Sequence, residues 1–258
     1  MKCKNCENDF VGSYCNECGQ KVMDRLTIKG VWNLIIDDVF EVNKGLLYTL
    51  KQLWVNPGKT SLDFINGKTK NYYSPLKYLI FWTAIYFILN SLIDNRQGQS
   101  IENLIFNQSK PFSAGSFRDY MDIYQEMIFR HPDIFYLGLT PFLAIVSFVI
   151  YRKRKFHFTE LLILYLYILG QIIFVVAVTI PLISLFGDKR LEDYKWMLAF
   201  MIPLIAIVIY LVIKSHKQFF NETWTKSSVK GLTILYVGQL IYGLTTLLIL
   251  NFIKLLSV

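Results

Sequence analysis

The stretch FTELLILYLYILGQIIFVVAVTIPLISLF, residues 158–186, contains a single charged side chain, Glu160, close to its start. A helix needs about 20 mostly apolar residues to cross the hydrocarbon core of a bilayer. The stretch exceeds this length and lacks the alternation of apolar and polar residues that is typical of a strand. Backbone polar groups in lipid must be satisfied within the segment. The sequence therefore predicts a membrane-spanning helix, long enough to tilt or to bend before Pro181.

Other apolar blocks of the chain resemble this stretch in length and composition. The chain is 53% hydrophobic and only 18% charged, whereas soluble domains carry about 25% charged residues. The predicted fold class is an all-α integral membrane protein, with five transmembrane helices in a membrane domain at 75–258. The five expected spans are 75–93, 133–151, 158–186, 196–213 and 229–253.

The net charge of +8 reflects membrane topology, because Lys and Arg cluster at the ends of the apolar blocks. No nucleic-acid partner is expected. Basic side chains gather in RKRKFH at 152–157, in the segment 214–230 and ahead of the first span, whereas acids match or outnumber bases in 94–132. Short loops rich in Lys and Arg stay in the cytoplasm. With five spans and no secretory leader at the start, we expect a cytoplasmic N-terminus and a C-terminus on the outer side.

All four cysteines of the chain lie in KCKNCENDFVGSYCNECGQK, residues 2–21. Disulfides are rare in reducing cytoplasm. Two Cys-x2-Cys pairs favour a tetrahedral metal site, and Gly19 after the second pair allows a tight turn. A redox dithiol would need only one pair, and a catalytic zinc would keep an open coordination position. We expect a zinc-ribbon-like head at 1–22 with a structural Zn²⁺, although iron also fits four sulfurs. The expected ligands are Cys3, Cys6, Cys15 and Cys18.

Residues 23–74 read as short amphipathic cytoplasmic helices that are too charged to cross a bilayer. The candidate helices are LTIKGVWNLIIDDVFEV at 26–42, KGLLYTLKQLWV at 44–55 and TSLDFI at 60–65. These helices either lie in the membrane interface, with basic residues on anionic headgroups, or pack on the ends of the spans. In the first case the headgroup contacts are Lys44, Lys51, Lys59, Lys68 and Lys70.

Two amides, Gln171 and Gln239, fall near the middle of their spans. They either hydrogen-bond between helices or line a polar path in which prolines break three spans, as in transporters. The other residues of that path would be Tyr165, Tyr242 and Thr245, with breaks at Pro141, Pro181 and Pro203.

A third group of residues, His157, Glu160 and His216, is expected at the cytoplasmic ends of the spans. These side chains either take part in interfacial ion pairs or form a metal or acid–base site. No catalytic residue is assigned from the sequence.

Three segments carry a resemblance to a known family: YCNECGQK at 14–21, KGLLYTLKQLWVNPGK at 44–59 and FINGKTKNYYSPLKYL at 64–79. They resemble an uncharacterised family of bacterial polytopic membrane proteins with an N-terminal cysteine knuckle. The resemblance covers roughly the first 80 residues of the chain. It implies a multi-pass protein of the bacterial inner membrane and carries no activity with it.

Three functions follow in order of preference. The first is a non-enzymatic protein whose zinc head and basic amphipathic segment engage a cytoplasmic protein partner or anionic membrane lipid. The second is a small-molecule or ion transporter or channel, with its path through the third and fifth spans. The third is a membrane-embedded, lipid-acting enzyme that uses His157, Glu160 and His216.

Overall fold

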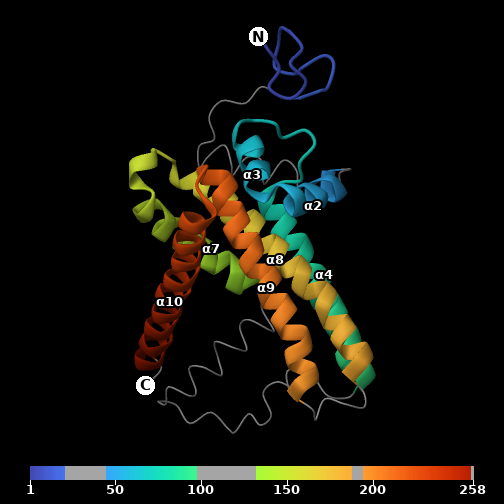
Figure 1. Ribbon diagram of the computed structural model, residues 1–258, viewed down its shortest axis with the longest axis vertical. Coiled ribbons are helices and arrows are strands. Elements are labelled where there is room, and N and C mark those ends of the chain that lie inside the picture. The colour runs from blue at the N-terminus through green and yellow to red at the C-terminus, as the bar shows by residue number, and fades with distance from the viewer. Residues whose placement is uncertain (21–44, 98–131, 188–193, 257–258) are drawn as a thin grey trace.

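The computed structural model describes residues 1–20, 45–97, 132–187 and 194–256, which contain seven α-helices and one short 3₁₀ helix. Within these ranges the β-type pairing is an isolated bridge between Lys2 and Asp9. In chain order the elements are α2 (Gly45–Val55), α3 (Pro57–Ile65), α4 (Pro75–Gln97), α7 (Pro132–Ile150), η1 (Arg152–Arg154), α8 (Phe158–Gly187), α9 (Tyr194–Phe220) and α10 (Trp224–Leu256) (Figure 1).

Helices α4, α7, α8, α9 and α10 are long and apolar enough to cross a membrane. They coincide with the five apolar blocks of the sequence, so the predicted helices are confirmed, and their length and composition suit a multi-pass membrane protein. Three helices extend several residues beyond their blocks: α4 continues to Gln97, α9 continues to Phe220, and α10 begins at Trp224. The length of each apolar block therefore predicted where a span lies. The helices extend beyond the blocks, because the flanking polar residues also favour helix.

Helix α8 is the centre of the bundle. The structure buries 72% of its apolar window, against 22% for α10. It packs against α4, α7, α9 and α3. A helix that is apolar all round suits the core, and the buried Leu161, Leu164 and Leu169 belong to the largest hydrophobic cluster.

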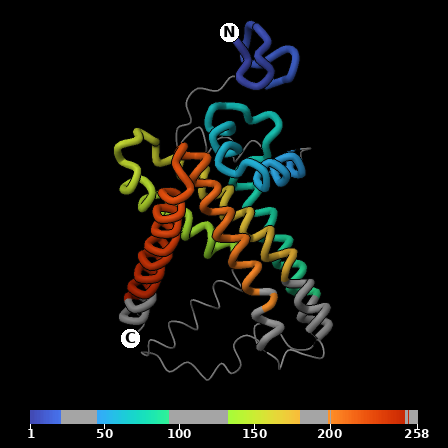
Figure 2. Tube along the Cα trace, in the orientation of Figure 1, coloured from blue at the N-terminus to red at the C-terminus, as the bar shows by residue number. Residues whose placement is uncertain are grey.

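The cysteine-bearing residues 1–20, called the head from here on, lie beyond one end of the bundle (Figure 2). This head end also carries α2, α3, η1 and the turn between α9 and α10, whereas the C-terminus lies at the opposite end (Figure 1). The loops that precede α8 and α10 meet at Glu222, whose side chain is 4% exposed. Its carboxylate accepts hydrogen bonds from Lys230 at 2.7 Å, Tyr151 at 3.2 Å and Arg154 at 3.3 Å. Both basic loops therefore fall on one side of the bundle.

Helix α3 packs directly on α9. Pro57 opens the helix, where its missing N–H does no harm. The N–H of Gly58 donates to Gln218 Oε1 at 3.0 Å. A side chain at Gly58 would overlap the carbonyl oxygen of Ser215. The backbones of α3 and α9 therefore touch, and only glycine fits at the contact.

Helix α2 packs with one face and leaves the other exposed. Leu53 and Thr49 are buried, and the Thr49 hydroxyl accepts the N–H of Tyr73 at 2.7 Å. The outer face carries exposed Leu47, Tyr48, Trp54 and Val55. The third candidate helix, at 26–42, lies outside the described residues.

Candidate metal centre

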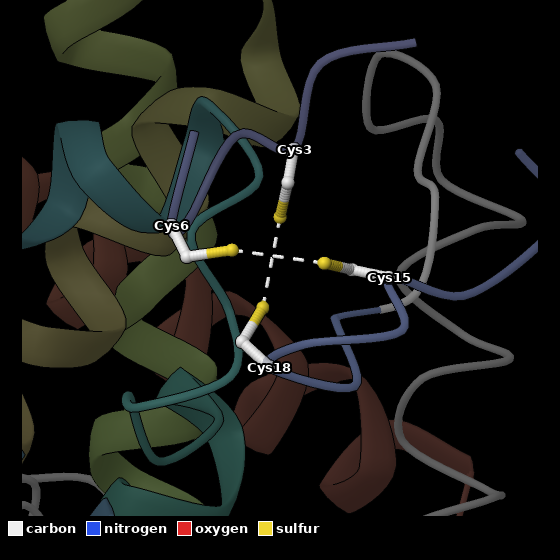
Figure 3. A group of neighbouring side chains, drawn as sticks. All are labelled: Cys3, Cys6, Cys15 and Cys18. Atoms are coloured by element: carbon white, nitrogen blue, oxygen red, sulfur yellow. Dashed lines mark hydrogen bonds between the residues drawn. The ribbon is translucent and has the colours of Figure 1, made fainter. Parts of the chain in front are cut away.

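The four cysteine sulfurs of the head converge on one point (Figure 3). Cys3 Sγ lies 3.6 Å from Cys18 Sγ, and Cys6 Sγ lies 3.6 Å from Cys15 Sγ. All four sulfurs lie within 4.8 Å of one another. A disulfide would need about 2.05 Å, whereas Zn–S bonds of about 2.3 Å in a tetrahedron put the sulfurs about 3.8 Å apart. The arrangement therefore matches a four-sulfur metal site.

Two similar turns position the cysteine pairs. In the first turn the Cys3 carbonyl accepts the Glu7 N–H at 3.0 Å, and in the second the Cys15 carbonyl accepts the Gly19 N–H at 2.9 Å. Gly19 has φ 68° and Glu7 has φ 63°. The sequence indicated the turn at Gly19, but it gave no sign that Glu7 adopts the same left-handed conformation, which a side chain disfavours.

Backbone N–H groups aimed at the sulfurs of Cys6, Cys15 and Cys18 act to lower the pKa of each thiol. The N–H of Cys18 holds the pKa of Cys15 below its ordinary value. Desolvation raises the pKa of Cys18, but the Gln20 N–H and neighbouring donors outweigh it and the net shift is downward. The N–H of Asn8 acts to lower the pKa of Cys6, yet desolvation and the nearby thiols raise it to about 12. Four thiolates this close need a cation to ionise together, and the donor set fits Zn²⁺ or iron.

The head docks onto the loop between α3 and α4 through Gln20. This side chain is 5% exposed. Its amide nitrogen donates to Thr69 Oγ1 at 2.9 Å, and its amide oxygen accepts the N–H of Lys70 at 2.9 Å. The backbone carbonyl of Gln20 also accepts the Cys15 N–H at 2.8 Å. One residue therefore connects the cysteine turn to the loop, and the sequence analysis did not single it out.

The described lysines among those expected to contact headgroups lie on the protein surface. Lys51, Lys59, Lys68 and Lys70 are exposed, and Lys44 lies outside the described residues. Lys68 forms an ion pair with Asp63 at 3.2 Å. The other three carry positive charge onto the surface at the head end.

The two amides at membrane depth do not meet. Gln171 is 2% exposed, and its oxygen accepts the Tyr78 hydroxyl at 2.6 Å, which joins α8 to α4. Gln239 is exposed on α10. Helices α7 and α9 continue through Pro141 and Pro203. Tyr242 packs between Phe135 and Phe142, and Tyr165 bonds to His216.

The residues of the enzyme hypothesis do not form one group: Glu160 contacts the backbone of His157, whereas His216 bonds to Val212 and Tyr165. Glu160 accepts the backbone N–H of His157 at 3.0 Å, as a residue of the first helical turn does at a helix start. His216 is 1% exposed, and its Nδ1 lies 2.8 Å from the Val212 carbonyl, which can only accept. Nδ1 therefore carries the proton and Nε2 accepts the Tyr165 hydroxyl at 3.0 Å. Among the described residues, the group of His, Cys, Asp and Glu side chains close enough to share a metal is the cysteine group.

Comparison with known proteins gives one match. A family model described as a protein of unknown function (DUF3667) matches residues 43–87. This match contains α2, α3, the loop that receives Gln20 and the first half of α4. No curated protein and no solved structure matches the chain.

Proposed function

We propose that this chain is a non-enzymatic protein of the bacterial inner membrane, whose zinc-folded head and segment 45–74 bind anionic lipid headgroups at the cytoplasmic surface. The observation that carries the proposal is the attachment of the head, through Gln20, to a loop whose neighbouring helix α2 presents an apolar and basic outer face.

The head needs the metal to fold. Its hydrophobic cluster contains only Phe10 and three of the cysteines. A unit of this size cannot bury enough apolar surface to fold alone, so metal binding would supply most of the folding free energy. Four sulfurs fill the coordination sphere and leave no position for a substrate. This supports a structural metal and a recognition role for the head.

The outer face of α2 has the composition of a membrane-interface contact. Leu47 is 75% exposed, and Tyr48, Trp54 and Val55 are also exposed. Tyr and Trp favour the headgroup level of a bilayer, and Lys51 on the same helix is exposed to headgroup charge. Tyr48 and Trp54 also keep ring contacts with Tyr72 and Phe174, and a face of this composition suits a membrane interface.

The orientation follows from charge. The head, α2, α3, η1 and the turn between α9 and α10 share one end of the bundle (Figure 1). The basic segments 45–74, 152–157 and 214–230 belong to this end. The positive-inside rule assigns that end to the cytoplasm. The same surface charge supports anionic lipid, since each Lys or Arg near such a membrane contributes about 1 kcal/mol to binding.

The test is lipid selectivity of the purified full chain. Native mass spectrometry would count phosphatidylglycerol and phosphatidylcholine bound to the wild type and to the triple variant Lys51→Gln, Lys59→Gln, Lys70→Gln. The matched control, Arg152→Gln, Lys153→Gln, Lys226→Gln, removes the same charge from other exposed positions at the same end.

We expect the wild type and the control to prefer phosphatidylglycerol and the first triple variant to lose that preference. If both triple variants lose the preference for phosphatidylglycerol equally, the preference depends only on total positive charge. That result would reject a dedicated lipid-binding surface. A different outcome is a protein that co-purifies with the wild type and is lost from the first triple variant, while bound lipid stays unchanged. The surface would then bind a protein partner instead of lipid.

A further inference from the structure

Gln239 is a polar side chain that faces away from the bundle in the middle of α10. It follows the first residue of the span, Trp224, by 15 positions and precedes the last, Ile249, by 10. At 1.5 Å per residue, it lies at least about 15 Å from either end. Its side chain is exposed and makes no hydrogen bond within the described part of the chain. An amide at this depth faces hydrocarbon, where unpaired polar groups are costly.

The other polar side chains around Gln239 do not share this problem. The hydroxyls of Thr233, Thr245 and Thr246 donate to backbone carbonyls of α10 itself, at 2.7–2.8 Å. Such hydroxyls can face lipid without a partner from another helix. The oxygen of Gln171, the comparable amide in α8, accepts the hydroxyl of Tyr78, while its Nε2 is buried without a partner among the described residues. Gln239 therefore stands out as the exposed amide for which the described chain supplies a partner to neither the oxygen nor the nitrogen.

The outer face of α10 around Gln239 has the spacing of a helix–helix seam. Its residues follow one another at intervals of four, three, four and three, which is the heptad spacing of left-handed helix pairs. Gly243 and Thr246, which are half-buried at the edge of this face, are small and allow two backbones to approach. The inner face, with Gly231, Ile234 and Gly238, is already buried in the bundle. The seam consists of Leu232, Tyr236, Gln239, Gly243 and Thr246, and Tyr236 is 70% exposed.

We propose that α10 pairs with α10 of a second copy of this chain through this seam. Two copies inserted in the same orientation place Gln239 at the same depth. An amide carries both donors and an acceptor, so Gln239 of each copy satisfies Gln239 of the other across a two-fold axis. The pairing is independent of the head and of lipid selectivity.

Co-expression of two differently tagged full-length copies tests the pairing. One tag is captured from mild detergent and the other is quantified. We expect Gln239→Leu to reduce co-capture by about tenfold, the order of magnitude of one or two interhelical hydrogen bonds. Thr233→Leu is the matched control, since it makes the same kind of apolar change off the seam. Equal membrane yield and equal metal content of each variant would establish that the chain still folds.

Cysteine cross-linking in membranes tests which face of α10 lies at the contact between the two copies. Tyr236→Cys should form a dimer, whereas Leu244→Cys, which is 52% exposed but off the seam, should match the background of the wild type with its four head cysteines. Absence of co-capture in the wild type would overturn the proposal. Unchanged co-capture of Gln239→Leu, or equal cross-linking at both positions, would also overturn it, because the contact would then lie elsewhere.

Discussion

The side-chain oxygen of Gln20 accepts the backbone N–H of Lys70 at 2.9 Å, although 50 positions separate the two residues. The same amide also donates to Thr69. The link joins the cysteine turn to the loop that leads into the first spanning helix. The cysteine turn and this loop are therefore held together by two hydrogen bonds.

Gln20→Ala should release the head from the loop. Each of the two lost hydrogen bonds is worth about 1 kcal/mol, so protection of the Lys70 amide from hydrogen exchange should fall about tenfold or more. Exchange mass spectrometry of peptides that cover 66–74 measures this. Asn16→Ala removes an exposed bond within the head, from Asn8 at 3.1 Å, and should leave Lys70 protected. Identical exchange in both variants would show that Gln20 does not hold the head in place.

The purified chain should contain one zinc ion, detected by elemental analysis. Cys15→Ser removes one of four thiolates and should reduce zinc to a small fraction of one equivalent, because an incomplete sphere rarely holds a structural ion. The head should then lose its fold, and exchange at Lys70 should rise as in Gln20→Ala. Full zinc occupancy in Cys15→Ser would mean that the metal binds elsewhere.

Gly58→Ala should separate α3 from α9. The new Cβ would overlap the Ser215 carbonyl oxygen and lie 2.6 Å from Phe219 N, and these backbone atoms cannot rotate away. We expect a loss of about 1–3 kcal/mol, seen as a lower melting temperature in detergent. Lys59→Ala changes the next residue, which is exposed, and should melt like the wild type. A stable Gly58→Ala protein would contradict the close backbone contact.

Tyr78→Phe removes the hydroxyl that Gln171 accepts, and leaves a buried amide oxygen without its partner. The expected cost is about 1–3 kcal/mol. The double variant with Gln171→Leu should recover part of this loss, because it removes the stranded amide as well. Tyr210→Phe, at an exposed position of α9, serves as the control. Additive losses from the two substitutions would show that the two side chains do not interact.

Glu222 should make stability depend on pH. Burial alone would raise the pKa of this carboxyl, but the hydrogen bonds and charges of Lys230, Tyr151 and Arg154 outweigh burial and lower it. A folded-state pKa below the unfolded value means that the stabilisation is complete above the ordinary range of Glu, near pH 4.3, and is lost as pH falls through the lowered value. Melting temperature measured between pH 7 and pH 3 should therefore fall less steeply in Glu222→Gln. Parallel curves would exclude Glu222 as the group responsible.

Local properties of the sequence predicted much of this architecture. Span length depends on a run of apolar residues, because lipid offers no partner to the backbone, and all five runs form helices. Two pairs of cysteines at close spacing likewise predicted the group of sulfurs, since a two-residue gap limits where each sulfur can point. Helix limits such as Phe220 and Trp224 were less predictable, because a helix that has crossed the membrane can continue into polar sequence.

Partners distant in the chain could not be predicted from it. Gln171 and Gln239 are the same residue at similar depth, and only the packing of the helices turns one inward to Tyr78 and the other outward to lipid. The same holds for Gln20, whose importance depends on a loop 50 positions away, and for α2 and α3, which both pack on the bundle while α2 keeps an exposed face. Composition determines which segments enter the membrane, because transfer into lipid is a sum over individual residues. Tertiary structure decides which faces meet, because a contact depends on two surfaces at once.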